Sequence, residues 1–402
     1  MSQGDMSQIV VPQVDMSEAD QHSHATLVPD VVDDRRGFLV GAAAAGAAAV
    51  GAHGIRLDDE GTRAEFEYAV AATWRHCERT DISWPAAQRE MVRYATLAAS
   101  SHNSQPWRFR LLERGIVVLP EPASGESAGD FDSHERFVSL GCAVENIVQA
   151  ATAFGLRAVP SFDHDVGGIY VDFTIGAKVW TALFDAIPRR RTTHGDYDGR
   201  PVAPEHLRLF EAIGNGDSVR MLLFTESWQL DQIRELILAS ANACVDDAAL
   251  VGEVTSWTRF SYGEALATRD GLCASSLSGP LVPTPGATVP FVRTLANEGL
   301  NRTQEREVRS SSGFAVFVSP EGDPAHWVEA GRCCQRFALQ AAALGIRTAF
   351  MCRPPDGSAA SAQFAAFLGM GGRPPDVVMR FGYGPGTLRS LRRPAEQFIL
   401  SA

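Results

Sequence analysis

An octet of small polar residues, Ser100 to Trp107, is the stretch of this chain whose side chains are best suited to chemistry. It reads Ser-Ser-His-Asn-Ser-Gln-Pro-Trp. Serine hydroxyls and asparagine amides both donate and accept hydrogen bonds, so they could hold a polar ligand. The same residue types also cap helices and form turns. From composition alone, the octet is therefore either a binding loop or the end of a helix.

Two arginine-rich segments later in the chain could bind an anion. Residues 189–194 read Arg-Arg-Arg-Thr-Thr-His, and residues 390–394 read Ser-Leu-Arg-Arg-Pro. Guanidinium groups match phosphate oxygens in pairs, and threonine hydroxyls can supply further donors. A solvated basic linker and a C-terminal run of charge are the alternative interpretations.

The elements that would position the octet are a helix before it and a hairpin after it. Residues 88–99 carry apolar side chains at the spacing of one buried helix face. Residues 107–111 and 116–120 have strand patterns and flank a Glu-Arg-Gly turn signal. The octet therefore lies where a helix meets a strand.

A second pattern predicts that the chain holds two copies of one unit. Residues 141–155 and 331–345 have helical apolar stripes at equivalent positions, 190 residues apart, and an apolar strand follows each of them. This pattern indicates an internal duplication, with chance similarity between two alanine-rich helices as the alternative. Two such halves would pack against each other as subunits do in a symmetric dimer.

The composition is that of an ordinary soluble globular protein of 402 residues, 45% hydrophobic and 21% charged. A net charge of −12 argues against nucleic acid or an anionic membrane as a partner. Lys178 is the only lysine, so the chain has no P-loop and only one candidate for a Schiff base. The seven cysteines lack Cys-x-x-Cys spacing, which argues against a metal site, and their odd number argues against a complete disulfide framework.

The first 60 residues resemble an export leader. Residues 1–34 are polar and aperiodic, which predicts disorder. Arg35-Arg36 then precedes an apolar run over 39–52, which is too short for a stable membrane span but fits a signal peptide. The pair of arginines resembles the twin-arginine signal, and an alanine-rich linker is the alternative. A functional leader predicts a periplasmic or cell-envelope location, and otherwise the protein would be cytoplasmic.

Residues 260–312 differ from the rest of the chain. Proline and glycine recur along them and exclude long regular elements. Long irregular segments within a compact unit often act as lids, so we expect an irregular lid over this range.

Three separated motifs carry a resemblance to the nitroreductase superfamily. Residues 99–107 look like its Pro-Ser-Ser-x-Asn-x-Gln-Pro-Trp signature, with alanine in place of the first proline. Residues 190–197 are similar to its Arg-x-Ser-x-Arg/Lys-x-Phe opening, and residues 390–394 resemble its Ser-x-Arg-Arg-Pro tail. The motif order, the doubled length and the leader resemble the Acg-like branch, in which two nitroreductase halves are fused.

The resemblance implies an α+β fold of two tandem halves, each with an antiparallel-rich sheet flanked by helices, pseudo-dimeric in one chain. The expected parts are a leader over 1–60, a first half over 61–187, and a second half over 188–402 that contains the lid. A monomer with an internal pseudo-dimer is the expected state.

The resemblance also implies that FMN is the cofactor and assigns its contacts. The phosphate would be held by Arg190, Thr192, His194, Arg392 and Arg393, and the ring would be lined by Ser100, Ser101 and Asn103. The first half lacks the arginine opening and the second half lacks Gln-Pro-Trp, so we expect one FMN per chain.

Two functions fit this cofactor. An oxidoreductase would pass hydride from NAD(P)H through FMN to a nitroaromatic, quinone or similar small acceptor, and would need neither a metal nor a catalytic protein nucleophile. A flavin-sequestering protein would hold the FMN under its lid with little turnover. A hydrolase is a third possibility, but no Gly-x-Ser-x-Gly motif supports it.

Overall fold

Two antiparallel sheets organise the residues that this computed structural model describes, 60–121, 130–246, 248–273 and 300–401. The first sheet has the order β1-β2-β4-β3 and the second the order β5-β8-β10-β9. Both sheets therefore place their strands in the sequence first, second, fourth, third. The expected α+β architecture, with an antiparallel sheet in each half, is confirmed. The strands are β1 (Trp107–Leu111), β2 (Gly115–Pro120), β3 (Leu156–Asp163), β4 (Gly168–Ile175), β5 (Arg220–Phe224), β8 (Gly313–Val318), β9 (Arg347–Phe350) and β10 (Val377–Gly382).

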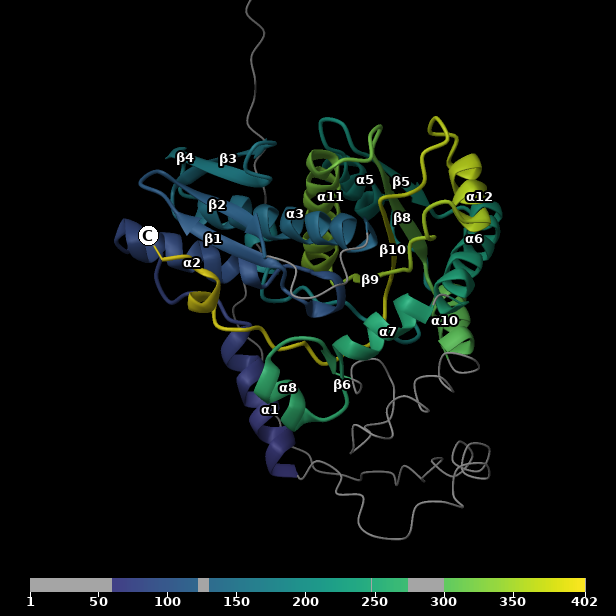
Figure 1. The fold of residues 1–402 in the computed structure, drawn as a ribbon, viewed down its shortest axis with the longest axis horizontal. Helices are drawn as coiled ribbons and strands as arrows, with labels where there is room; N and C mark the ends of the chain where they lie inside the picture. Colours follow the sequence, from purple (N-terminus) through teal and green to yellow (C-terminus); the bar gives the residue numbers. More distant parts are fainter. Residues whose placement is uncertain (1–59, 122–129, 247, 274–299, 402) are drawn as a thin grey trace, which may run out of the picture. The chain divides into compact units, whose positions relative to one another are not determined.

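Two long helices, α3 (Asp130–Ala153) and α11 (Pro324–Ala343), cross each other between the sheets (Figure 1). Their apolar side chains join those of both sheets in one large core. Both helices begin several residues before the apolar stripes expected at 141 and 331. The side chain of Asp323 accepts a hydrogen bond from the His326 amide at 3.1 Å and so caps the start of α11. Capping and helix propensity extend a helix beyond its apolar stripe, which periodicity cannot detect.

The crossing of α3 and α11 depends on two glycines. A Cβ atom on Gly141 would lie 2.0 Å from the carbonyl oxygen of Val328, and one on Gly331 would lie 2.0 Å from that of Val138. The two contacts are reciprocal, because each residue of one pair has its counterpart 190 positions away in the other pair. The helix backbones can therefore touch only because neither glycine carries a side chain.

Most of the other helices pack on α3, on α11 or on one another, with α2 on α3, and α4 and α5 on α11. Helices α6 and α12 enclose a second, smaller core against the second sheet, and α8 packs on α1. The remaining described elements include a short parallel pair, β6 and β7. Their bounds are α1 (Glu60–Thr73), α2 (Trp84–Thr96), α4 (Ala182–Ala186), α5 (Pro204–Gly214), α6 (Ser227–Asp246), α7 (Ala248–Trp257), β6 (Thr258–Arg259), α8 (Tyr262–Thr268), β7 (Leu272–Cys273), α10 (Leu300–Arg309) and α12 (Ala359–Leu368).

The C-terminal tail returns to the first sheet. Ile399 forms a parallel bridge with Phe109 of β1, and the Leu400 amide donates to the Phe109 carbonyl at 2.8 Å. The short helix η5 (Ala395–Phe398) packs against α2, and Figure 1 shows the end of the chain beside α2 and β1. The last residues of the chain, which belong to the expected second half, therefore pack on the sheet of the first half.

The described residues bear on some of the expected segments, namely the lid, the leader and the boundary between the halves. The range 260–312 is not irregular throughout, because α8 and α10 lie within it, while 274–299 lie outside the described residues. The leader, residues 1–59, lies outside them as well. The boundary at 187/188 stays a prediction, since α4 before it and α5 after it both pack on α11. No helix in the described ranges is long and apolar enough to cross a membrane.

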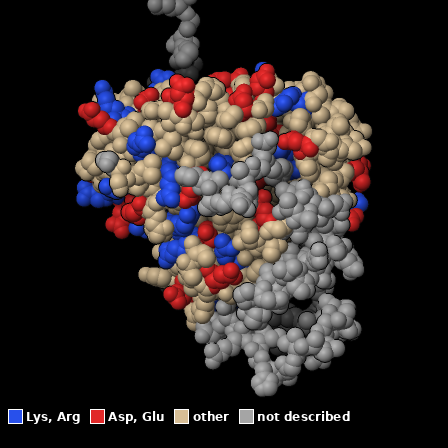
Figure 2. All heavy atoms as spheres, in the orientation of Figure 1, with Lys and Arg blue, Asp and Glu red and all other residues tan. Residues whose placement is uncertain are grey.

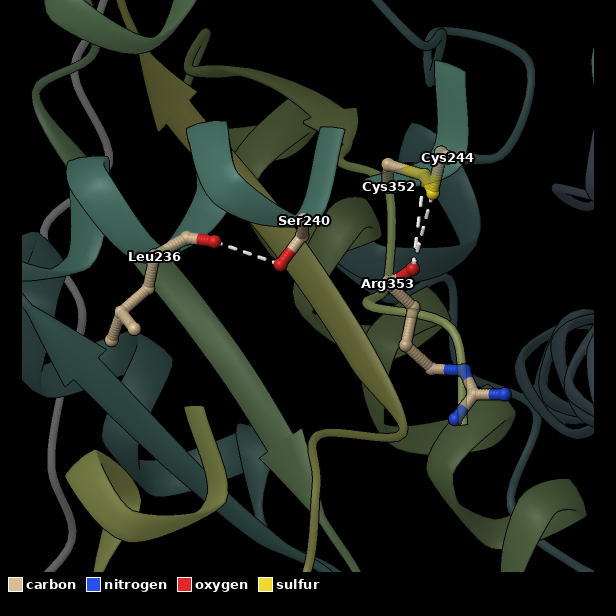
Figure 3. The surroundings of a disulfide bond; sticks show 5 residues. All are labelled: Leu236, Ser240, Cys244, Cys352 and Arg353. Atoms are coloured by element: carbon tan, nitrogen blue, oxygen red, sulfur yellow. Dashed lines mark hydrogen bonds between the residues drawn. A yellow bond between two sulfur atoms is a disulfide. The ribbon is translucent and has the colours of Figure 1, made fainter. Parts of the chain in front are cut away.

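A disulfide joins Cys244, in α6, to Cys352, just after β9 (Figure 3). The carbonyl oxygen of Arg353 lies 3.5 Å from the Cys244 sulfur. The sequence analysis missed this bond, because the two cysteines are 108 residues apart and share no motif. Cys142, Cys333 and Cys334, by contrast, are buried without a disulfide, as expected for thiols inside a helical core.

Replacing Gly331 by alanine should destabilise the fold, because the new methyl group would collide with the Val138 carbonyl. We expect a loss of about 1–3 kcal/mol in the free energy of unfolding, the usual cost of overpacking. Gly252, an exposed α7 residue with open space around it, is the matched control. Gly252→Ala should be neutral or slightly stabilising in the same urea titration. Equal effects of both substitutions would contradict the close helix crossing.

Breaking the Cys244–Cys352 bond should lower stability, because it releases a closed loop of about a hundred residues. The double variant Cys244→Ser/Cys352→Ser should unfold at a lower denaturant concentration, with a loss of about 2–5 kcal/mol. A reducing agent should shift the wild-type unfolding midpoint in the same direction and leave the double variant unchanged. A reductant effect of equal size in both proteins would show that another bond is responsible.

Candidate functional site

The octet folds into a tight turn between α2 and β1. Its centre is the single 3₁₀ turn η1 (Ser101–Asn103), and three residues have left-handed backbones: His102 (φ 47°), Asn103 (φ 56°) and Gln105 (φ 56°). Histidine and asparagine are among the residues that tolerate this region best. The Ser100 hydroxyl accepts a hydrogen bond from the Gln105 amide at 3.2 Å. The octet therefore forms a turn. Its left-handed residues direct their side chains differently from residues of a helix or strand.

Asn103 and Gln105 tie three distant segments together. Asn103 Nδ2 donates to the carbonyls of Gly271 (3.0 Å) and Leu391 (3.1 Å). Gln105 Nε2 donates to the Arg269 carbonyl at 3.0 Å, and its Oε1 accepts from the Arg393 amide at 2.9 Å. The octet, the α8–β7 segment and the C-terminal tail therefore meet at one place. The buried Asn103 Oδ1 has no partner among the described residues.

Ser101 and His102 lie close to two carboxylates, Glu135 and Glu253. The Ser101 hydroxyl donates to the Glu135 carboxylate of α3, and the Ser101 amide donates to the Ser139 hydroxyl at 3.2 Å. His102 Nδ1 lies 3.3 Å from the Ser101 hydroxyl oxygen and 3.5 Å from Glu253 Oε1 of α7. Burial alone would lower the pKa of His102, but Glu253 and Glu135 outweigh it, so its pKa is raised.

Five arginines gather beside the octet and are named here the arginine cluster: Arg190, Arg191, Arg347, Arg389 and Arg392. No ion pair with a carboxylate is found for any of them within the described ranges. The guanidinium carbons of Arg190, Arg389 and Arg392 lie 5.8, 5.7 and 4.9 Å from the centre of the Trp74 ring.

Burial is the main cause of the lowered pKa values in this cluster, and neighbouring arginines add to it for Arg389 and Arg392. Burial lowers the pKa of Arg190 to about 10. Burial together with Arg191, Arg190 and Arg347 lowers the pKa of Arg389 to about 10. Burial, and then Arg190, lowers the pKa of Arg392 as well. Gathered guanidinium groups without a counter-charge are what an anionic ligand such as a phosphate would neutralise, so the residues present fit a phosphate-bearing cofactor.

The cluster divides into an inner and an outer part. Arg392 donates from Nε to the Thr96 carbonyl (2.8 Å) and from Nη2 to the Ala98 carbonyl (3.0 Å), while Arg190 Nη2 donates to the Leu97 carbonyl (3.2 Å). These oxygens lie at the C-terminal end of α2, where a cation is favourable. The two inner arginines thus have donors engaged by the helix end.

Each outer arginine donates one hydrogen bond to a backbone carbonyl outside α2. Arg191 donates to the Thr387 carbonyl (2.7 Å), Arg347 to the Gly384 carbonyl (3.2 Å) and Arg389 to the Arg189 carbonyl (3.4 Å). The sequence analysis did not name Arg191, Arg347 or Arg389 as site residues. Arg389 directly precedes the Ser-x-Arg-Arg-Pro motif and could have been included on that ground, whereas Arg347 reaches the cluster only through the pairing of β9.

The remaining expected phosphate residues lie around this cluster. Thr192 forms a parallel bridge with Thr348 of β9. His194 Nδ1 lies 3.9 Å from Glu307, and Arg393 Nη2 lies 3.4 Å from Glu121. Both of these cations thus already have a carboxylate neighbour. Whether Thr192, His194 and Arg393 contact a phosphate stays a prediction.

Metal binding and surface charge are two further aspects of the described residues. The described residues contain no group of three histidine, cysteine or acidic side chains that could hold a metal ion. On the face drawn in Figure 2, acidic and basic side chains are interspersed. The arginine cluster is therefore distinguished by the absence of paired acids around it, more than by the number of its charges.

Comparison with known sequences now gives relatives. No family model matches the chain. Two proteins of Mycobacterium tuberculosis, strains CDC 1551 and H37Rv, are each 25% identical to it over 307 residues, 74% of this chain and 85% of theirs. Both carry the name "Putative NAD(P)H nitroreductase". The resemblance to the nitroreductase superfamily is confirmed. The finer assignment to the Acg-like branch stays a prediction.

Solved structures of this kind are also similar. A "putative nitroreductase" of Anabaena variabilis covers 79% of this chain and 91% of its own, at 9% identity and a TM-score of 0.42. The FMN-dependent nitroreductase NfnB of Mycobacterium smegmatis, solved with NADPH, covers 50% of this chain and 87% of its own, at 17% identity and a TM-score of 0.33. These scores are too low to carry a functional argument.

Replacing Glu307 by glutamine should destabilise the segment between α4 and α5, which carries Arg190 and Arg191 of the arginine cluster. Glu307 Oε2 lies 3.6 Å from the fully buried Arg380, which would lose its counter-charge at a cost of about 3 kcal/mol. Burial alone would raise the pKa of Glu307, but His194 and Arg380 outweigh it and lower it. The stabilising effect is thus complete above the unfolded pKa near 4.5 and disappears as the pH falls through the lower folded value.

Unfolding of wild type and of Glu307→Gln should be compared from pH 7 to pH 3. The difference in unfolding free energy should shrink in the acid range. Glu305→Gln, which removes an exposed partner of Arg309, is the control and should cost less than about 1 kcal/mol. A difference that stays constant down to pH 3 would contradict the assigned ion pair.

Proposed function

We propose that this chain binds one FMN and works as an NAD(P)H-dependent oxidoreductase of the nitroreductase type. The observation that carries the proposal is the arginine cluster, which has no paired carboxylate in the described ranges and lies beside the octet. The octet and the tail that supplies Arg389 and Arg392 are joined directly through Asn103 and Leu391. The groups that donate hydrogen bonds to the phosphate and the polar groups that face the ring would thus belong to one site.

The outer arginines are the proposed phosphate ligands. A phosphate monoester carries close to two negative charges near neutral pH. Arg191, Arg347 and Arg389 can meet it with open donors, while Arg190 and Arg392 add buried positive charge behind them. Thr192 and the buried, unpartnered hydroxyl of Thr193 would supply neutral donors.

The octet is the proposed ring wall. Ser100 and Ser101 would offer hydroxyls, and the unpartnered Asn103 Oδ1 would accept a hydrogen bond from a ring N–H. The FMN ring itself supplies the hydride chemistry when bound, and the chain supplies orientation and polarity. No protein nucleophile is required.

A single site per chain follows from an internal duplication whose two halves have diverged. The equal strand orders and the reciprocal glycine contacts support the duplication. Ser139, which accepts the Ser101 amide, corresponds at the same 190-residue offset to Glu329, whose carboxylate accepts the Ser218 amide at 3.0 Å. The second copy of this position is therefore acidic. We propose a monomer with an internal pseudo-dimer.

A second candidate function is flavin sequestration. The backbone of Arg269 and Gly271 is held onto the octet by Gln105 and Asn103. This segment would restrict access to a ring bound at the octet. Under this alternative the protein would hold FMN tightly and reduce acceptors slowly.

Export through the twin-arginine route is part of the proposal. That route carries proteins that have already folded, which suits a chain that acquires its cofactor in the cytoplasm. The Cys244–Cys352 disulfide supports it, because such bonds persist mainly in oxidising compartments.

Titration of the purified protein with FMN should give one FMN per chain. Arg191→Gln and Arg389→Gln should each weaken FMN binding about 10- to 100-fold, the effect of one lost charged hydrogen bond. Their affinity for riboflavin, which lacks the phosphate, should stay within about twofold. Arg79→Gln removes an exposed arginine paired with Asp81 and is the control. Two FMN per chain, or equal losses for riboflavin, would refute the proposed site.

Turnover separates the two candidate functions. With NADPH and a nitroaromatic or quinone, an oxidoreductase should reoxidise its flavin within seconds in single-turnover experiments. A sequestering protein should bind FMN equally well but show little acceptor-dependent reoxidation.

A further inference from the structure

We propose that His102 is a catalytic acid in this site: Glu253 orients its ring through Nδ1, and Nε2 delivers a proton to the electron acceptor. The inference rests on the proposed function, because it takes the octet as the wall of the flavin site. It adds a proton-handling role to a motif position that the family signature leaves open.

The position of His102 is determined by its backbone. It lies between Ser101 and Asn103, the two residues proposed to face the ring, and has φ 47° and ψ 21°. Its neighbours on both sides are held by hydrogen bonds to other elements. The Cα atom of His102 is therefore fixed, and its side chain is 23% exposed.

The hydrogen bonds select one arrangement of the imidazole. The Ser101 hydroxyl donates its proton to Glu135, so its oxygen is left to accept from His102 Nδ1–H at 3.3 Å. Glu253 Oε1 lies on the same nitrogen at 3.5 Å. Nε2 has no partner among the described residues. A carboxylate on one nitrogen and an open second nitrogen are the usual arrangement of an acid–base histidine.

The charges around His102 are both acidic. Glu135 faces it from α3 and Glu253 faces it from α7, and within its own turn Ser101 contributes only a hydroxyl. These two acids raise the pKa of His102 although burial opposes them. The protonated form is therefore more populated near neutral pH than in a free imidazole.

The proton balance of acceptor reduction requires such a group. A quinone gains two electrons and one proton as a hydride from the reduced flavin, which is thereby oxidised, and it needs a second proton to become a hydroquinone. His102 would supply that proton: its Nε2–H bond breaks, and an O–H bond forms on the acceptor. Neutral His102 then regains a proton from water. Glu253, which is 35% exposed, stays on Nδ1 throughout and orients the ring.

His102→Gln and Glu253→Gln test the proposal by stopped-flow kinetics with a quinone. The wild-type rate of flavin reoxidation should fall as the pH rises through the raised pKa of His102. His102→Gln should reoxidise about 100-fold more slowly at low pH, with little pH dependence. Flavin reduction by NADPH should be unchanged in both variants. His164→Gln, an exposed histidine of the β3–β4 turn, is the control.

A second readout does not depend on activity. The His102 pKa, followed by NMR in the protein without flavin, should fall in Glu253→Gln, because the variant removes the charge that raises it. An unchanged pKa would refute the role of Glu253, whether or not the protein binds FMN.

The outcomes distinguish this inference from the proposed function. Failure to bind FMN would refute the proposed function. Normal FMN binding with a wild-type pH profile in His102→Gln would refute the catalytic acid alone. Faster FMN release from His102→Gln, with unchanged reoxidation, would show that His102 only holds α7 against the octet and would also refute the proposal.

Discussion

The backbone contact between α3 and α11 is the constraint on which the rest of the structure depends. Gly141 and Gly331 allow the two helices to touch, and each helix carries its own sheet on one side. The distance between the halves is therefore set by backbone atoms, which cannot adjust as flexible side chains can. The arginine cluster comes from the second half but rests on Trp74 and on the end of α2 in the first half, so its position depends on this crossing.

The arginine cluster is an electrostatic consequence of that arrangement. Its arginines come from the segment between α4 and α5, from the start of β9 and from the C-terminal tail. They would be well solvated if these segments were apart. Burial, together with neighbouring arginines, lowers the pKa of Arg389 and Arg392, and the carbonyls at the end of α2 stabilise Arg190 and Arg392 only in part. Such a site favours an anion because the protein has already assembled the positive charge.

The octet links the arginine cluster to the contacts that His102 and Ser101 make with Glu253 and Glu135. Its left-handed turn directs side chains where a helix or strand would not, and the buried amides of Asn103 and Gln105 thereby bind the tail and the α8–β7 segment. The acids on α3 and α7 approach the same turn from two sides. The proposed phosphate site, ring wall and proton donor would thus be coupled through eight consecutive residues.

Local patterns in the sequence determined much of this protein. Alternating apolar residues predicted β1, β2 and some later strands but not β3, β8 or β9, periodic stripes predicted α3 and α11, and the spacing of 190 residues indicated two equivalent units, because side-chain burial follows backbone periodicity. The motifs also identified the octet and two of the arginine segments. These properties depend on near neighbours in the chain, which a sequence displays directly.

Only the tertiary structure decided which distant residues meet. Arg347 enters the cluster because its neighbour Thr348 in β9 forms a bridge with Thr192. Glu253 reaches His102 because α7 packs on η1. The Cys244–Cys352 bond likewise joins residues with no shared pattern. Contacts between remote segments depend on how helices and sheets pack, and packing is a property of the whole core that no local pattern encodes.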